Sequence, residues 1–168
     1  MATAFDSITD EQRALIEAAP LFFIASTHPE LEAGPDGQGP VNVSPKGGVP
    51  LHVLDDHTVA YLDYGGSGNE TARHAAASGP ATVMVMSLDE DAAVVRLYGH
   101  ARITPLNESP LREQVLARAE STTSIGLGLR QVVSLEVQST ATSCGYGVPL
   151  LELRAQRTKS EHGRRYKE

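Results

Sequence analysis

Short apolar stretches separated by turn-forming residues run through the chain and predict a mainly β structure. Leu21–Ser26 is apolar almost throughout, whereas Val41–Ser44 alternates apolar and polar residues with the period of two of a half-buried strand. The triplet Asp55-Asp56-His57 separates two such stretches and is typical of a hairpin turn. So many short strands indicate a closed or nearly closed barrel. The predicted strands are Leu21–Ser26, Val41–Ser44, Val49–Leu54, Thr58–Asp63, Thr82–Met86, Val94–Ile103, Val132–Ser143 and Leu150–Arg154.

Helical patterns are few, and they predict elements appended to that barrel. An opening helix is expected to begin after Thr9, where Gln12 completes a capping box, and to end before Pro20. Two further helices are expected near Asn69–Ser78 and near Ser109–Ala119. The segment between the first two predicted strands is rich in Gly and Pro and is predicted to be a loop.

The length of 168 residues fits one domain, with a core expected over residues 20–155 and a basic tail over residues 156–168. The formal net charge of −7 argues against a nucleic-acid partner, because a phosphate backbone requires a basic surface. The apolar runs are far shorter than the roughly 20 residues that cross a bilayer, and no signal-peptide pattern opens the chain. A lone cysteine, Cys144, suits a reducing compartment, so a cytoplasmic protein is expected. The basic tail is interpreted as solvated, with a flap that reaches an anionic ligand as the alternative.

A glycine-rich turn between a strand and a helix, within residues 60–74, is the most informative segment for chemistry. Its glycines let the backbone approach a ligand, and Ser67, Asn69 and Thr71 place polar side chains around the first free N–H groups of the helix. Such an arrangement can hold a phosphate. The alternative is purely structural, because Ser67 and Glu70 match the S-x-x-E capping box. The segment matches neither the P-loop nor the dinucleotide-binding glycine pattern.

A second polar face is predicted on the strand that begins at Val41. Alternation places Asn42, Ser44 and Lys46 on one side of this strand. An amide, a hydroxyl and an ammonium group can hydrogen-bond the edge of a planar cofactor ring or pair with a phosphate. The alternative is an edge strand that leads into a Pro-Lys-Gly-Gly turn.

Four segments in this order resemble the pyridoxamine 5'-phosphate oxidase-like family. Phe22–Ser26 together with Val41–Gly47 is similar to the opening strand pair of these proteins. Residues 62–74 resemble the turn and helix of one bacterial branch, residues 96–103 the long strand that follows, and residues 143–149 the late strand and turn. Four motifs in the right order are far more specific than any one of them.

The resemblance implies a six-stranded split β-barrel, a homodimer, and FMN bound in a cleft between the subunits. The residues implied to bind FMN are Asn42, Ser44, Lys46, Leu62, Asp63, Ser67, Gly68, Asn69, Thr71 and Arg96. The first three would approach the ring or the ribityl chain, the next two would line the ring, and those of the glycine-rich turn would hold the phosphate. For Arg96 a structural role in its strand is an equal alternative.

The function implied is that of an FMN-dependent oxidoreductase acting on an unidentified small molecule. The vitamin-forming oxidase of this family carries an Arg-Lys pair in its phosphate loop, where this chain has Asn69-Glu70-Thr71, so pyridoxamine phosphate is not the expected substrate. Hydride exchange with a flavin needs no acid or base from the protein, and no catalytic residue stands out. The alternatives are a deazaflavin-dependent reductase of the same fold, a non-catalytic flavin-binding or storage protein, and an interaction protein that has lost its cofactor.

Cys144 and three histidines, His52, His57 and His74, are the remaining candidates for chemistry. The histidines lack the spacing of metal ligands, and no second cysteine or acidic cluster completes a set, so no metal site is predicted. Cys144 precedes a Gly-Tyr-Gly turn and is interpreted as structural.

Overall fold

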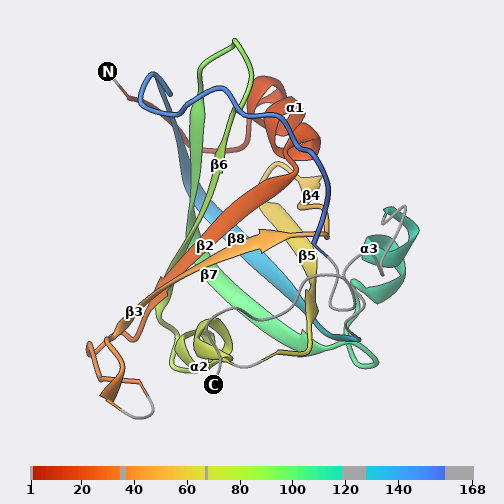
Figure 1. Ribbon diagram of the computed structural model, residues 1–168. Coiled ribbons are helices and arrows are strands. Elements are labelled where there is room, and N and C mark those ends of the chain that lie inside the picture. Colours follow the sequence, from red (N-terminus) through yellow and green to blue (C-terminus); the bar gives the residue numbers. More distant parts are fainter. Residues whose placement is uncertain (1, 35–36, 67, 119–127, 158–168) are drawn as a thin grey trace.

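The computed structural model describes residues 2–34, 37–66, 68–118 and 128–157, which form eight strands and three helices. The hydrogen-bonded order of the strands is β3-β2-β6-β7-β8-β5-β4, all antiparallel, and β1 pairs with β8. The sheet coils round on itself as a barrel (Figure 1). In chain order the elements are β1 (Thr3–Phe5), α1 (Asp10–Ala18), β2 (Leu21–Thr27), β3 (Val41–Gly47), β4 (His52–Asp55), β5 (Thr58–Tyr64), α2 (Glu70–Ala76), β6 (Pro80–Met86), β7 (Val94–Pro105), α3 (Arg112–Arg118) and β8 (Leu129–Ser143).

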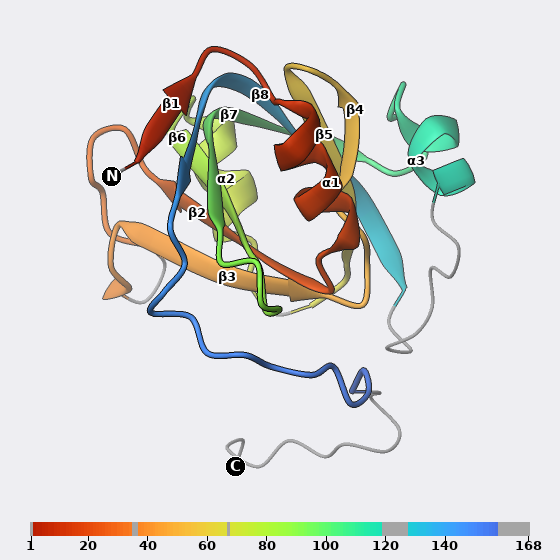
Figure 2. The same cartoon turned by 90° about the horizontal axis from the view of Figure 1, so that it is seen from above.

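The mainly β architecture expected from the sequence is confirmed, with two differences in the strands. The prediction of a strand at Leu150–Arg154 is wrong: this segment has no regular secondary structure and runs outside the barrel (Figure 2). Its sequence alternates like a strand, but a strand forms only where a neighbouring strand supplies hydrogen-bond partners along its length. The short strand β1 was not predicted, because three residues give no readable period. The described chain therefore has eight strands, where the resemblance implied six.

Local capping fixes where α1 begins, as the sequence predicted. The Gln12 backbone N–H donates to Thr9 Oγ1 at 3.2 Å, and the Thr9 backbone N–H donates to Gln12 Oε1 at 3.1 Å. This reciprocal pair satisfies two backbone donors at the start of the helix. Seen along the barrel, α1 and α2 lie within the outline of the strands, whereas α3 stands outside it (Figure 2). None of the helices within the described ranges is long and apolar enough to span a membrane.

The register between β2 and β3 decides which side chains face the interior of the barrel. Phe22 opposes Lys46 and Ser26 opposes Asn42, with Ser44 midway between them on β3. Directly opposed residues of an antiparallel pair project to the same face. Because Phe22 and Ser26 are buried, the polar face predicted for β3 is confirmed and is turned inward.

Polar side chains, rather than a shared backbone ladder, connect the end of β3 to β5 in the described chain. The Lys46 ammonium donates to the Asp63 carboxylate at 2.9 Å, and the Tyr64 hydroxyl donates to the Gly48 carbonyl at 2.9 Å. Strands β3 and β4 are the two ends of the hydrogen-bonded order, so the sheet is open on this side. The site described next lies at this opening.

Candidate functional site

A polar pocket of about 520 Å³ lies between β3 and β5. Its walls come from β3, from β5 and the glycine-rich turn after it, from the first residues of α2, and from the start of β8. The volume falls within the ~300–1,000 Å³ of small-molecule sites. The polar and charged side chains that line it are Gln38, Asn42, Ser44, Lys46, Tyr61, Asp63, Tyr64, Asn69, Glu70, Thr71, Arg130 and Gln131.

Asp63 lies at the centre of the charged groups in this pocket. Its side chain is only 7% exposed, and its Oδ1 accepts a hydrogen bond from Lys46 Nζ at 2.9 Å. Arg130 donates to Oδ2 through Nε and Nη2 at 3.0 and 2.9 Å, and Gln131 Nε2 donates to the same oxygen at 2.9 Å. Two cations thus share one carboxylate, and the cluster of the three charged side chains carries a net positive charge.

The ionisation of Asp63 follows from these contacts. Burial alone would raise the pKa of this carboxyl, because a low-dielectric surrounding disfavours the charged form. The Lys46 ammonium and the hydrogen bonds from Lys46, Arg130 and Gln131 outweigh burial, and the pKa of Asp63 lies below its ordinary value. Asp63 is therefore a carboxylate at neutral pH, and it holds both cations at the pocket.

The glycine-rich turn after β5 is tied to the same cluster. Gly68 has a φ of 88°, a left-handed conformation that glycine adopts without steric cost. Its carbonyl accepts a hydrogen bond from Arg130 Nη2 at 3.2 Å, and Asn69 Oδ1 accepts one from Gln131 Nε2 at 3.2 Å. The first two polar residues of β8 therefore connect Asp63 to the turn.

The interpretation of this turn as a Ser67–Glu70 capping box is wrong. The N-cap of α2 is Asn69, two residues later than that box requires, and its side chain makes no capping hydrogen bond. The Glu70 carboxylate instead accepts from Arg73 Nε and Nη2 at 3.0 and 2.8 Å. Ser67 itself lies outside the described residues.

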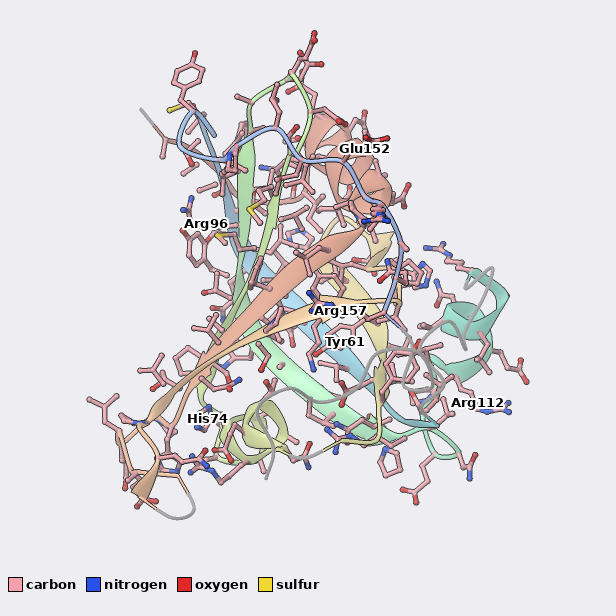
Figure 3. The ribbon with its side chains drawn as sticks, viewed as in Figure 1. Tyr61, His74, Arg96, Arg112, Glu152 and Arg157 are labelled. Atoms are coloured by element: carbon pink, nitrogen blue, oxygen red, sulfur yellow. The ribbon has the colours of Figure 1, made fainter. Side chains whose placement is uncertain are left out.

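Tyr61, labelled in Figure 3, lines the pocket and carries a buried hydroxyl. The residue is 2% exposed, its ring packs edge-on against Phe22 with centroids 5.0 Å apart, and Lys46 Nζ lies 5.7 Å from its centroid. The hydroxyl finds no hydrogen-bond partner among the described residues. Burial, with the charge of Asp63 second, raises the pKa of Tyr61, so the group is a protonated donor at neutral pH. A buried donor left unpaired costs about 1–3 kcal/mol, which a ligand acceptor would recover.

Most of the site residues predicted from the sequence meet in this pocket. Ser67 cannot be placed, since it lies outside the described residues. Arg96 lies elsewhere: it projects outward from β7, donates to Ser143 Oγ at 3.1 Å, and points away from the barrel (Figure 3). The structure therefore does not bring Arg96 to the pocket of its own chain. The predicted residues that do line the pocket are Asn42, Ser44, Lys46, Leu62, Asp63, Gly68, Asn69 and Thr71.

Tyr61, Arg130 and Gln131 are among the pocket residues that were not predicted. Tyr61 could have been found by alternation, because it is two positions before Asp63 on the same strand. Arg130 and Gln131 precede the predicted strand at Val132, and only the pairing of β5 with β8, in which Asp63 opposes Gln131, carries them to the site. No local sequence pattern shows that pairing.

The histidines and the cysteine do not line the pocket. His74 is fully buried, and its Nε2 accepts from Arg73 Nη2 at 2.9 Å, since a guanidinium can only donate. Its Nδ1–H therefore donates to Ser26 Oγ at 2.9 Å, which ties α2 to β2. Cys144 is exposed. Within the described ranges no three His, Cys, Asp or Glu side chains gather as metal ligands would.

Comparison with known proteins extends the structural description. The sequence model of the family described as pyridoxamine 5'-phosphate oxidase matches residues 8–144. A pyridoxamine 5'-phosphate oxidase family protein of Aspergillus flavus, ustO, is 35% identical over 156 residues. The match covers 91% of this chain but 58% of the fungal protein, so the chain spans little more than half the length of that relative.

Solved structures share the fold at lower sequence identity. A candidate pyridoxamine 5'-phosphate oxidase of Lactobacillus delbrueckii has a TM-score of 0.57 at 20% identity, over 81% of this chain and 94% of that one. HupZ of Group A Streptococcus has a TM-score of 0.56 at 22% identity, over 77% and 89%. An FMN-binding protein of Syntrophomonas wolfei has a TM-score of 0.50 at 18% identity, over 83% and 85%. The split-barrel fold is confirmed by these likenesses, and the sequence matches show that the chain belongs to the pyridoxamine 5'-phosphate oxidase family.

Proposed function

We propose that this chain is a flavoprotein that binds FMN in the pocket between β3, β5 and β8, and that it is an oxidoreductase acting on a small molecule. The observation that carries the proposal is the donor set of the pocket: two cations, Lys46 and Arg130, together with the side chains of Asn42 and Ser44. Membership of the family supports a flavin, and so does the Syntrophomonas wolfei neighbour, which is described as FMN-binding.

The residues present fit an anionic cofactor with a planar ring. Lys46 and Arg130 offer positive charge, while Asn42 and Ser44 offer an amide and a hydroxyl along the inner face of β3. A pocket of about 520 Å³ is of the size that small-molecule ligands occupy.

The protein's part in the chemistry is binding, orientation and electrostatics. Bound FMN supplies the two-electron redox chemistry. Lys46, held by Asp63 at 2.9 Å, places a positive charge that favours a negatively charged ring over a neutral one. Tyr61, which also lines the pocket, keeps its proton at neutral pH. No acid or base is assigned to the described pocket residues, because hydride exchange requires none from the protein.

The absorbance spectrum of the purified protein tests the cofactor. A two-band flavin spectrum supports the proposal if denaturation releases the coloured compound and it is identified as FMN. A single band typical of a deazaflavin would instead show that the cofactor is a deazaflavin. A colourless protein whose melting temperature does not change with added FMN would refute flavin binding. Reduction of the bound flavin followed by repeated reoxidation in air separates an oxidoreductase from a storage protein, in which no turnover is expected.

We also propose that the chain forms a homodimer. Val41 and Val43 are each 62% exposed on the outer face of β3, the strand whose inner face lines the pocket, and Tyr98 is 38% exposed on β7. Exposed apolar side chains on one sheet face are typical of a partner surface. A second copy docked there would lie beside the pocket. We propose that FMN binds the dimer and not the monomer, in which case FMN at about 100 times its dissociation constant stabilises the dimer by roughly 2.7 kcal/mol. Light scattering with and without FMN tests this, and a monomer under both conditions would refute it.

A further inference from the structure

Arg130 occupies a position between the buried carboxylate and the glycine-rich turn. Its Nε and Nη2 donate to Asp63 Oδ2, and its Nη2 also donates to the Gly68 carbonyl at 3.2 Å. The side chain is 29% exposed, so it is accessible from the pocket that it lines. A guanidinium has five N–H donors in a planar fork, and these contacts with described residues leave part of that fork for a further acceptor.

Few cationic side chains line the pocket near Arg130. In the described chain Lys46 and Arg130 are the cationic side chains that line the pocket. Lys46 approaches Asp63 from β3, through the other carboxylate oxygen. Arg73, on the helix after the turn, is engaged by Glu70 and by the ring of His74. The turn itself contributes amide and hydroxyl groups but no cation.

We propose that Arg130 binds the phosphate of the cofactor, so that the charge for this group comes from the start of β8 and not from the turn. The inference rests on the proposed function, and it assigns a role that the turn sequence Asn69-Glu70-Thr71 cannot fill. A guanidinium fork matches phosphate oxygens better than a point charge does. Asp63 is then a positioning residue: it holds Arg130 beside the turn, and it competes with the phosphate for the same donors.

Paired titrations with FMN and riboflavin test the role of Arg130, because riboflavin lacks only the phosphate. In the wild type FMN is expected to bind more tightly than riboflavin. Arg130→Gln is expected to lower FMN affinity about 10- to 100-fold, as loss of a charge-assisted hydrogen bond implies, and to leave riboflavin affinity within about twofold. Arg102→Gln is the matched control, since Arg102 is an exposed strand arginine outside the pocket, and it should change neither affinity. Flavin fluorescence quenching reports all of these without any assay of activity.

Two further variants keep the test decisive. Arg130→Lys retains the charge without the fork and should retain part of the preference for FMN, even if Arg130→Gln folds poorly. Asp63→Asn keeps one acceptor oxygen that can still hold Arg130 beside the turn, but it removes the negative charge that competes with the phosphate, so it should increase the ratio of FMN to riboflavin affinity.

Several results would overturn the assignment of Arg130. One is an equal loss of FMN and riboflavin affinity in Arg130→Gln, and another is no loss of affinity for either ligand. A third is loss of the preference for FMN in Lys46→Met instead of in Arg130→Gln. Each of these leaves flavin binding itself intact. A wild-type protein that binds neither ligand would refute the proposed function itself, and the Arg130 assignment with it.

Discussion

Replacing Asp63 by Asn is expected to destabilise the fold far more than the same change at Asp56, although both carboxylates form ion pairs of the same length. Lys46 Nζ–Asp63 Oδ1 and Arg13 Nη2–Asp56 Oδ1 are each 2.9 Å. The Asp63 side chain is 7% exposed, whereas that of Asp56 is 69% exposed. Water screens an exposed pair, which contributes only about 0–1 kcal/mol.

The magnitude at Asp63 follows from what the substitution leaves behind. An asparagine side chain at this position would retain the shape of the aspartate but remove the charge that Lys46 and Arg130 share. Breaking a buried pair costs about 3–5 kcal/mol, and one charge-assisted hydrogen bond is worth about 1.5–3 kcal/mol. Because Lys46 and Arg130 are 22% and 29% exposed and can be rehydrated, we expect a loss of about 2–4 kcal/mol for Asp63→Asn and below about 1 kcal/mol for Asp56→Asn.

The pH dependence provides a second measurement on the same variant. The pKa of Asp63 is lower in the folded chain than in the unfolded one, where an aspartate titrates near ~3.9. Its contribution to stability is therefore fully present above that pH and is lost as the pH falls through the folded-state pKa. Urea denaturation at pH 7 and in steps below pH ~4 should show the wild type and Asp63→Asn converging in acid. Equal losses at Asp63 and Asp56, or a difference that stays constant into acid, would refute this account.

Three further predictions concern the cofactor and the barrel. Lys46→Met should lower the reduction potential of bound FMN, by about 30 mV for each 1.4 kcal/mol of lost preference for the reduced ring, measured against a reference dye; an unchanged potential would place Lys46 away from the ring. Asn69→Asp should weaken FMN binding at least about tenfold but not riboflavin binding, because a carboxylate would face the phosphate. If a titration gives the variant the same FMN affinity as the wild type, the turn is not part of the site. Gly99→Ala should cost about 3 kcal/mol or more in urea denaturation, since a methyl group would overlap the Glu136 carbonyl, whereas Gly39→Ala has open space and should cost little.

The faces of individual strands could be predicted from the sequence, because their period is local. Asn42, Ser44 and Lys46 lie on one side of β3 for the same reason that any alternate residues of a strand do. The pattern of Leu150–Arg154 is similar, yet it forms no strand, since pairing depends on a neighbour that the segment itself does not specify. Arg96 shows the converse limit: alternation identifies its face, but only the coiling of the sheet into a barrel shows that this face is the outer one.

Long-range pairing decided the part of the site that the sequence did not show. Asp63 and Arg130 are 67 positions apart, and they meet because β5 and β8 are adjacent with Asp63 opposite Gln131. An aspartate at the end of a strand and an arginine at the start of another are common in any sequence. Only the register converts them into a buried carboxylate with two cations, so the charge of the pocket is a property of the tertiary structure.

The way the barrel closes explains why stability and binding draw on the same side chains. Between β3 and β5 the described chain is bridged by polar side chains, chiefly Lys46 with Asp63, where a continuous sheet would have backbone hydrogen bonds. A backbone ladder cannot exchange its partners for a ligand, but an ammonium and a guanidinium can. Asp63 thus stabilises the opening of the barrel and, by the same contacts, keeps Lys46 and Arg130 directed into the pocket. A residue needed only for the fold would lose stability and affinity together when replaced. Asp63→Asn is expected instead to lower the free energy of unfolding and to raise the preference for FMN over riboflavin. Stability and ligand preference then change in opposite directions, as expected where a carboxylate that stabilises the fold occupies the cations that bind an anionic ligand.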